Sequence, residues 1–192
     1  MKKILIALGI LIILAIVIFA SYNSLVSKDQ AVQSSWAQVE TDYQRRADLI
    51  PNLVATVKGV ANFEQETLTD VVNARAKATG INLDANDLTP EKITQFENAQ
   101  TDLSGALSRL LVVAEAYPTL TASESFRGLQ TQLEGTENRI AVSRKDFNIA
   151  VQDYNTAIRV FPTNIIAKIF SFEEKAYFES VAGGDVVPSV EF

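Results

Sequence analysis

The sequence predicts an all-α fold, in which an N-terminal transmembrane helix is followed by an elongated antiparallel helical bundle with a long kinked first helix. Three observations predict it. Ile4–Ala20 is an unbroken run of 17 non-polar residues, preceded by Lys2 and Lys3. From residue 25 to residue 161, apolar residues recur at spacings of three and four, the pattern of helices that bury one face. The chain also lacks an alternating strand pattern of useful length, so no sheet is expected.

The apolar run is just long enough to cross a hydrocarbon core of ~30 Å if Tyr22 lies in the interface. A cleaved secretory signal is the alternative, since lysines before an apolar stretch suit both kinds of segment. Bulky Ile18 and Phe19 beside Ala20 make a poor cleavage site, which favours an uncleaved anchor. The anchor is assigned to residues 1–21, and the side chains chosen to mark the span are Ile4, Leu8, Leu11, Ile16 and Phe19.

The orientation of the anchor follows from its flanking charges. Lys2 and Lys3 precede the span, and only Lys28 lies in the first twenty residues after it. Cytoplasmic flanks carry the excess of basic residues, so we expect a cytoplasmic N-terminus and an extracytoplasmic body.

The first helix of the body is expected to continue from Tyr22 to Thr79. Pro51 lies inside its pattern and removes one amide donor, but the apolar residues keep the same phase on both sides, which indicates a kink within a continuous helix. A loop is expected at 80–90, further helices at 91–117 and 122–161, and a shorter amphipathic piece from Ile165 to Phe172. The helical domain is assigned to 22–180 and an irregular C-terminal tail to 181–192.

The lengths of these helices differ. At the standard rise, the helix over 22–79 measures about 85 Å, and its partners measure about 40 Å and about 60 Å. If the chain folds back after Gly80, the first helix overhangs its partners next to the membrane. The overhang carries an apolar seam that needs a partner, either the C-terminal amphipathic helix or other copies of the chain. The hypothesis is a homo-oligomer assembled there. The seam residues are Val32, Trp36, Val39 and Tyr43.

Polar residues on or beside the apolar seams are candidates for buried polar groups. They are Glu64, Arg75, Glu115, Glu137, Arg144, Asn148 and Asn155. Buried pairs among them would fix the register between long helices, or alternatively poise a chemical site. Asn148 and Asn155 are seven residues apart and therefore on one helical face, where amide ladders between helices explain them without a ligand.

The chain contains no Cys and no His. This composition excludes thiolate nucleophiles, Cys-ligated metals, His-zinc sites and imidazole acid/base catalysis. No cofactor, metal or catalytic residue is predicted, and a metal site would need all-oxygen ligands. Without Lys2 and Lys3, 15 basic residues oppose 23 acidic residues, a net charge of −8, which argues against nucleic-acid binding.

The last three residues suggest one further hypothesis. Val190 and Phe192 form an apolar-x-apolar C-terminus, which grooves that bind by strand addition accept. A frayed tail that packs locally is the simpler interpretation.

Several motifs together resemble the LemA family of bacterial membrane proteins. The resemblance covers the chain from the anchor to about residue 180 and rests on these segments: Tyr22-Asn23-x-Leu25-Val26, Trp36, Arg45-Arg46-x-Asp48-Leu49-Ile50-Pro51-Asn52-Leu53-Val54, Glu115-x-Tyr117-Pro118, Arg144-x-x-Phe147-Asn148-x-x-Val151-x-x-Tyr154-Asn155, Phe161-Pro162 and Tyr177-Phe178. Phe147 stands where Tyr is usual. The resemblance implies a single-pass anchor in the bacterial inner (plasma) membrane, an antiparallel bundle and no enzymatic activity.

Three functional classes follow. The leading hypothesis is a non-catalytic, membrane-anchored scaffold or assembly protein of the cell envelope that associates with itself, and possible partners include other envelope proteins. The second is an extracytoplasmic sensor or adaptor that acts on a partner membrane protein. The third is an envelope enzyme with an oxygen-ligated metal, disfavoured because the sequence has no convergent carboxylate motif.

Overall fold

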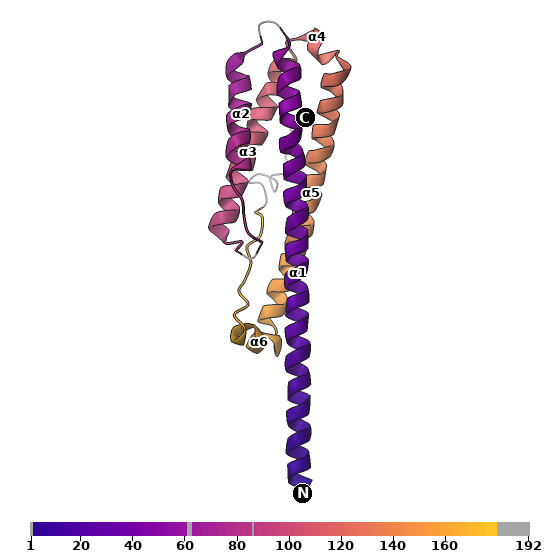
Figure 1. Cartoon of the computed structure of the whole chain (residues 1–192), viewed down its shortest axis with the longest axis vertical. Helices are drawn as coiled ribbons and strands as arrows, with labels where there is room; N and C mark the ends of the chain where they lie inside the picture. Colours follow the sequence, from indigo (N-terminus) through magenta and orange to yellow (C-terminus); the bar gives the residue numbers. More distant parts are fainter. Residues whose placement is uncertain (1, 61–62, 86, 180–192) are drawn as a thin grey trace, which may run out of the picture.

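One helix, α1 (Lys2–Lys58), runs the length of the molecule, and the other helices pack beside part of it (Figure 1). The computed structural model describes residues 2–60, 63–85 and 87–179. Within these ranges it is entirely helical apart from turns and extended links, as predicted. The remaining helices are α2 (Gln65–Thr79), α3 (Pro90–Ala114), α4 (Pro118–Thr121), α5 (Glu124–Arg159) and α6 (Thr163–Ile169).

The first part of α1 stands apart from the bundle. It contains an 18-residue window with a mean hydropathy of 3.2, none of which is buried, so it is long and apolar enough to cross a membrane. The five side chains chosen to mark the span are all exposed, from 53% at Leu8 to 72% at Ile4. Figure 1 shows this part of α1 projecting alone below the other helices. The structure therefore contains the predicted candidate span.

Local sequence signals set the helix boundaries. Thr89 caps α3, since its side chain accepts a hydrogen bond from the backbone N–H of Lys92, and Pro90 occupies the first turn. Ser123 caps α5 in the same way through the N–H of Phe126. The predicted end of a helix at Gly80 is also present, at the C-terminus of α2.

The first helix ends earlier than predicted. It continues through Pro51, as expected, but stops at Lys58, and α2 starts only at Gln65, so the prediction of one helix over 22–79 is wrong. Gly59 directly follows the break, and glycine costs about 1 kcal/mol in a helix interior. The apolar period continued across the break because α1 and α2 face one core: Leu53 and Val57 share a cluster with Leu68 and Val71.

The early turn changes which part of α1 is covered. The 36-residue helix α5 is about 54 Å long and packs along α1 from its far end back toward Leu25. The predicted oligomer seam is thereby buried inside one chain: Val32 and Val39 are 0% exposed, Trp36 is 1% exposed and Tyr43 is 7% exposed. The expectation that the seam is unmatched in the monomer is therefore wrong.

The buried side chains form two apolar clusters along the bundle. The membrane-proximal cluster contains the former seam with Phe96 of α3 and Phe147, Val151 and Tyr154 of α5. The far cluster joins the end of α1 to α2, α3 and the start of α5. In the sequences of α1, α3 and α5, a buried polar residue lies between the two clusters: Arg46, Gln100 and Thr136.

Trp36→Ala tests the intramolecular role of the seam. We expect it to lower the free energy of unfolding by about 3–5 kcal/mol, because a large aromatic side chain is removed from a filled core. Chemical unfolding of the full chain in detergent, followed by circular dichroism, measures this. Val142→Ala on the exposed face of α5 is the control and is expected to change stability by less than about 0.5 kcal/mol. A Trp36→Ala protein of unchanged stability that loses an oligomer would instead restore the seam as an interface.

Candidate functional site

An extended segment, residues 172–179, is held against the bundle by several side-chain hydrogen bonds, and we call it the C-terminal strap. It follows α6 and rises along the bundle toward the lower end of α3 (Figure 1). Two asparagines of α5 hold its backbone. Asn155 donates from Nδ2 to the carbonyl of Lys175 (2.8 Å) and accepts the N–H of Lys175 at Oδ1 (3.0 Å). Asn148 makes the same pair with Phe178, at 2.9 Å in both directions.

The spacing of the two asparagines matches the strap. Seven residues of helix cover about 10.5 Å, and three residues of extended chain, from Lys175 to Phe178, cover about 10 Å. Each amide therefore meets a backbone group that needs a partner and satisfies both its donor and its acceptor. The predicted amide ladder between helices is not what forms: both asparagines bind the strap.

An aromatic anchor ends the strap. The Phe178 side chain is 3% exposed, and its ring centroid lies 5.8 Å from that of Trp36 and 5.3 Å from that of Phe147. Phe96 lies 6.4 Å from the same ring. The strap thus completes the membrane-proximal core, and it closes over the residues that had been expected to face another subunit.

Lys175 ties the strap to the other side of the bundle. Its ammonium lies 2.8 Å from Oδ1 of Asp29 on α1 and donates to the carbonyl of Ala85 at 3.2 Å. The Tyr154 hydroxyl donates to the carbonyl of Glu173 at 2.9 Å. Burial, with the negative charges of Asp29 and Glu173, raises the pKa of Tyr154 to about 12, so the phenol stays protonated and remains a donor at neutral pH.

Arg144 binds the end of the strap that lies farther from the candidate span. Its guanidinium pairs with Glu97 of α3, donates to the carbonyl of Glu179 at 3.0 Å, and lies 4.7 Å from the centroid of the Phe178 ring. Burial raises the pKa of Glu97, and the charge of Arg144 opposes that rise. The contacts of Arg144 therefore join α5, α3 and the strap.

Arg46 is the buried charge that sequence reasoning missed. It is 2% exposed and donates from Nη1 to Glu137 Oε1 (2.9 Å) and Ser104 Oγ (2.8 Å), while Nη2 reaches the carbonyl of Gln100 (3.3 Å). Its place in the apolar period of α1, between Tyr43 and Ile50, was the available signal. These bonds join α1, α3 and α5 at one level and hold them in register.

Of the other candidate polar residues, one joins two helices and the others are exposed to solvent. Arg75 is half-buried and donates from Nε to the carbonyl of Ala47 at 2.8 Å, which joins α2 to α1. Glu64 and Glu115 are exposed at the start of α2 and the end of α3, so the expectation that they are buried is wrong. Both lie at helix ends, where the apolar period no longer dictates burial. Glu137 is not buried either: its side chain is 46% exposed, although it pairs with Arg46. The predicted tail 181–192, with Val190 and Phe192, lies outside the described residues.

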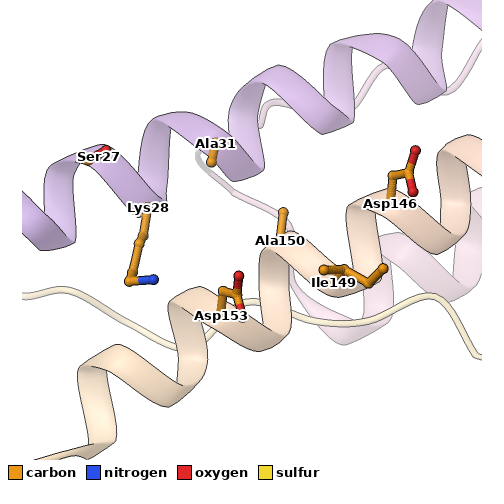
Figure 2. A pocket seen from close by; sticks show the side chains of 7 residues that line it. All are labelled: Ser27, Lys28, Ala31, Asp146, Ile149, Ala150 and Asp153. Atoms are coloured by element: carbon orange, nitrogen blue, oxygen red, sulfur yellow. The ribbon is translucent and has the colours of Figure 1, made fainter.

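A groove of about 340 Å³ runs between α1 and α5, beside residues 27–31 of α1 and 146–153 of α5. Figure 2 shows Lys28 extending from α1 toward Asp153 on α5, with Ala31 and Ala150 leaving room between the helices. The polar groups that line it are one amine, two carboxylates and the hydroxyl of Ser27. Across the part of the chain that the structure describes, no group of three His, Cys, Asp or Glu residues is placed to hold a metal ion.

The fold and these contacts define a class: a helical bundle with one candidate membrane span, whose core is closed by a C-terminal strap. The chain belongs to the LemA family, because the model of that family matches residues 35–192. The match begins beside Trp36 and includes the rest of the bundle and the strap. It confirms the resemblance seen in the sequence, and together with the candidate span it describes a bacterial membrane-associated protein.

Named relatives include two magnetosome proteins. Magnetosome protein MamQ 2 of Paramagnetospirillum magneticum is 28% identical over 203 residues, which cover 93% of this chain and 74% of that protein. Magnetosome protein MamQ of Magnetospirillum gryphiswaldense is 27% identical and covers 95% of this chain and 74% of its own length. Protein LemA of Metamycoplasma hominis is 24% identical over 158 residues, or 82% of this chain and 68% of that protein.

The paired hydrogen bonds of Asn148 and Asn155 predict which substitutions release the strap from α5. In Asn155→Ala both bonds to Lys175 are lost, so we expect hydrogen exchange at the Lys175 amide to speed up by roughly tenfold or more. Asn155→Asp is the matched variant: it keeps an acceptor for the Lys175 N–H, and it replaces the donor by a charged oxygen that faces the Lys175 carbonyl. It should lie between the wild type and Asn155→Ala. Equal exchange in all three proteins would show that the clamp does not hold the strap.

The hydrogen bonds of Arg46 predict that its half-exposed partner Glu137 contributes to the stability of the bundle. Glu137→Ala is expected to lower the free energy of unfolding by about 1–2 kcal/mol, because the buried guanidinium loses its carboxylate but keeps Gln100 and Ser104. Thermal unfolding of the full chain checks this. Glu115→Ala, at an exposed acid without a cross-helix pair among the described contacts, is expected to stay within about 0.5 kcal/mol. Equal losses in the two variants would contradict the role of Arg46.

Proposed function

We propose that this chain is a non-catalytic scaffold of the bacterial cell envelope, which holds a rigid helical bundle at a fixed place beside the membrane. One observation carries the proposal: α1 is unbroken from Lys2 to Lys58, so the same helix forms the candidate span and a wall of the core. A helix that is continuous across this junction transmits position and orientation, whereas a flexible linker would not.

The junction itself is short. The exposed apolar run ends at Ala20, and the first fully buried core residue of α1, Leu25, follows five residues later, or about 7.5 Å along the helix. Tyr22 already packs against Phe170 and Phe172. The bundle therefore begins where the candidate span ends. This arrangement suits a protein that presents a surface at a constant distance from the membrane.

The chemistry of the chain supports a non-catalytic role. The full sequence has no His and no Cys, and the strongest polar constellations serve packing: the asparagines clamp a strap, and Arg46 joins three helices. The names of the relatives mention a magnetosome and no reaction. Carried over to this chain, membership of a larger assembly such as the one these names mention agrees with a structural task.

The finer details of the proposal concern topology and association. The two lysines before the span support a bundle on the outer side of the inner membrane. Self-association, or association with other envelope proteins, would use surfaces other than the buried Trp36 seam. Because the chain has no Cys, Ser108→Cys at an exposed site of α3 gives one position for a membrane-impermeant thiol reagent. Labelling in intact spheroplasts is expected, and labelling only after lysis would reverse the topology.

The scaffold role predicts discrete contacts in cells that depend on the rigid junction. A photo-reactive residue at exposed Val112 or Val142 is expected to yield cross-linked products of fixed mass. A short Gly–Ser linker inserted between Asn23 and Ser24 should abolish or scatter these products, because it frees the bundle from the span.

Asn23→Ala with Ser24→Ala is the matched control, since both positions are exposed and the helix stays continuous. It should leave the products unchanged. Products that persist with the linker, or an absence of products at every surface position, would contradict the scaffold.

A further inference from the structure

The membrane-proximal end of the bundle carries apolar side chains that the described residues leave half exposed or more. Phe161 in the link between α5 and α6 is 79% exposed, Ile165 is 50% exposed, Ile169 is 66% exposed and Phe170 is 50% exposed. Phe161, Ile165 and Ile169 are spaced by four residues, and Phe170 adjoins the last of them. We call these four residues the apolar tip.

The helix that carries the tip is apolar on two sides. Ile166 and Ala167 are 4% and 3% exposed and pack in the membrane-proximal cluster, while Ile165 and Ile169 face outward. A helix of a water-soluble bundle needs only its inner face to be apolar, and its outer face is normally polar. The outer face of α6 is therefore suited to an apolar surrounding that the described residues, 2–60, 63–85 and 87–179, do not supply.

The position of α6 along α1 shows what surrounds it. Phe170 and Tyr22 have ring centroids 4.8 Å apart, and Phe172 lies 6.0 Å from Tyr22. Ile18 also packs against the cluster that contains Ile166 and Ala167. Ile18 lies inside the exposed apolar run of α1, about one helical turn before Tyr22. In Figure 1, α6 lies beside α1 at the point where the lone span enters the bundle.

We propose that the apolar tip is a second membrane contact, which inserts into the interfacial layer of the bilayer that α1 spans. If the apolar run fills the hydrocarbon core, Tyr22 lies at the interface between hydrocarbon and head groups. Ile18 is four residues, or about 6 Å, from Tyr22 along α1, so side chains that pack near both residues lie within about 6 Å of the interface. Interfacial helices bury their apolar faces about 5–10 Å into the same layer.

The local charge agrees with a lipid surface. From Val160 to Phe172 the only charged residue is the exposed Lys168, whereas the whole chain carries 23 acidic residues. A long basic side chain at a membrane edge buries its methylenes and keeps its ammonium among the head groups. The segment that carries the tip therefore has no acidic residue; the nearest acidic residues after it in the sequence are Glu173 and Glu174, and Glu174 pairs with Arg159.

The proposal needs the candidate span but not the scaffold role, so each can fail without the other. A second contact would limit the rotation of α1 about its own axis and its tilt, because the bundle would touch the bilayer at two separated points. A bundle held only by the span would keep both freedoms. The tip would in this way determine which face of the bundle is turned away from the membrane.

The test places a probe at the tip and at a matched site. Ile169→Cys and Val112→Cys are each the sole Cys of their chain, and both native side chains are 66% exposed. Each full-length protein is labelled with an environment-sensitive fluorophore and reconstituted in vesicles of phosphatidylcholine and phosphatidylglycerol, with or without lipids that carry a spin-label quencher near the head group. We expect strong quenching and a blue-shifted emission at position 169, and neither at position 112.

Two further variants test the cause. With the probe moved to Phe161→Cys, the added changes Ile165→Ser and Ile169→Ser should reduce lipid quenching severalfold while circular dichroism stays unchanged, because both side chains lie outside the core. Lys168→Glu should reduce quenching more in vesicles with phosphatidylglycerol than in phosphatidylcholine alone. Equal quenching at positions 169 and 112 would overturn the proposal. So would a blue shift at 169 that depends on protein density and is insensitive to lipid quenchers, since a second copy would then cover the tip.

Discussion

The packing of the strap against the lower half of α1 is the constraint on which the rest of the bundle depends. α2 is 15 residues long, about 22 Å, so the α2–α3 hairpin reaches only part of the way down the 54 Å length of α5. At the lower end of the hairpin, Phe96 of α3 and Leu88 of the loop before it share the cluster of Trp36, and Phe178 of the strap completes that cluster. A bundle of long and short helices is thus completed by extended chain in place of a fourth helix.

Extended chain creates a problem that a helix does not, because its backbone groups lack internal partners. The structure solves it with side chains from α5 on one side and with the loop before α3 on the other, where the Ala176 N–H donates to the carbonyl of Leu88 at 3.3 Å. Directional bonds of this kind define one register, whereas apolar contacts alone would tolerate slippage. Arg46 serves the same purpose between the helices, since its acceptors lie on α3 and α5.

Most of the helices could be predicted from the sequence, because caps such as Thr89 and Ser123 and the end signal at Gly80 are local features. The break after Lys58 could not, since α1 and α2 bury residues of one core and their apolar period continues in phase across Gly59. That single error reversed the interpretation of Trp36, from an exposed seam to the centre of the core. Asn148 and Asn155 were recognised as a pair on one face, but their partner, a strap without a helical period, left no pattern in the sequence to predict.

The two ends of the strap connect the core to the membrane level. Phe172 at its start packs on Tyr22, where the span enters the bundle, and Phe178 at its end packs on Trp36, fourteen residues, or about 21 Å, further along α1. Lys175 joins the middle of the strap to Asp29 of the same helix. The strap therefore braces α1 over the stretch that follows the candidate span. It thus has two effects: it completes the core around Trp36, and it stiffens α1 between the candidate span and that core.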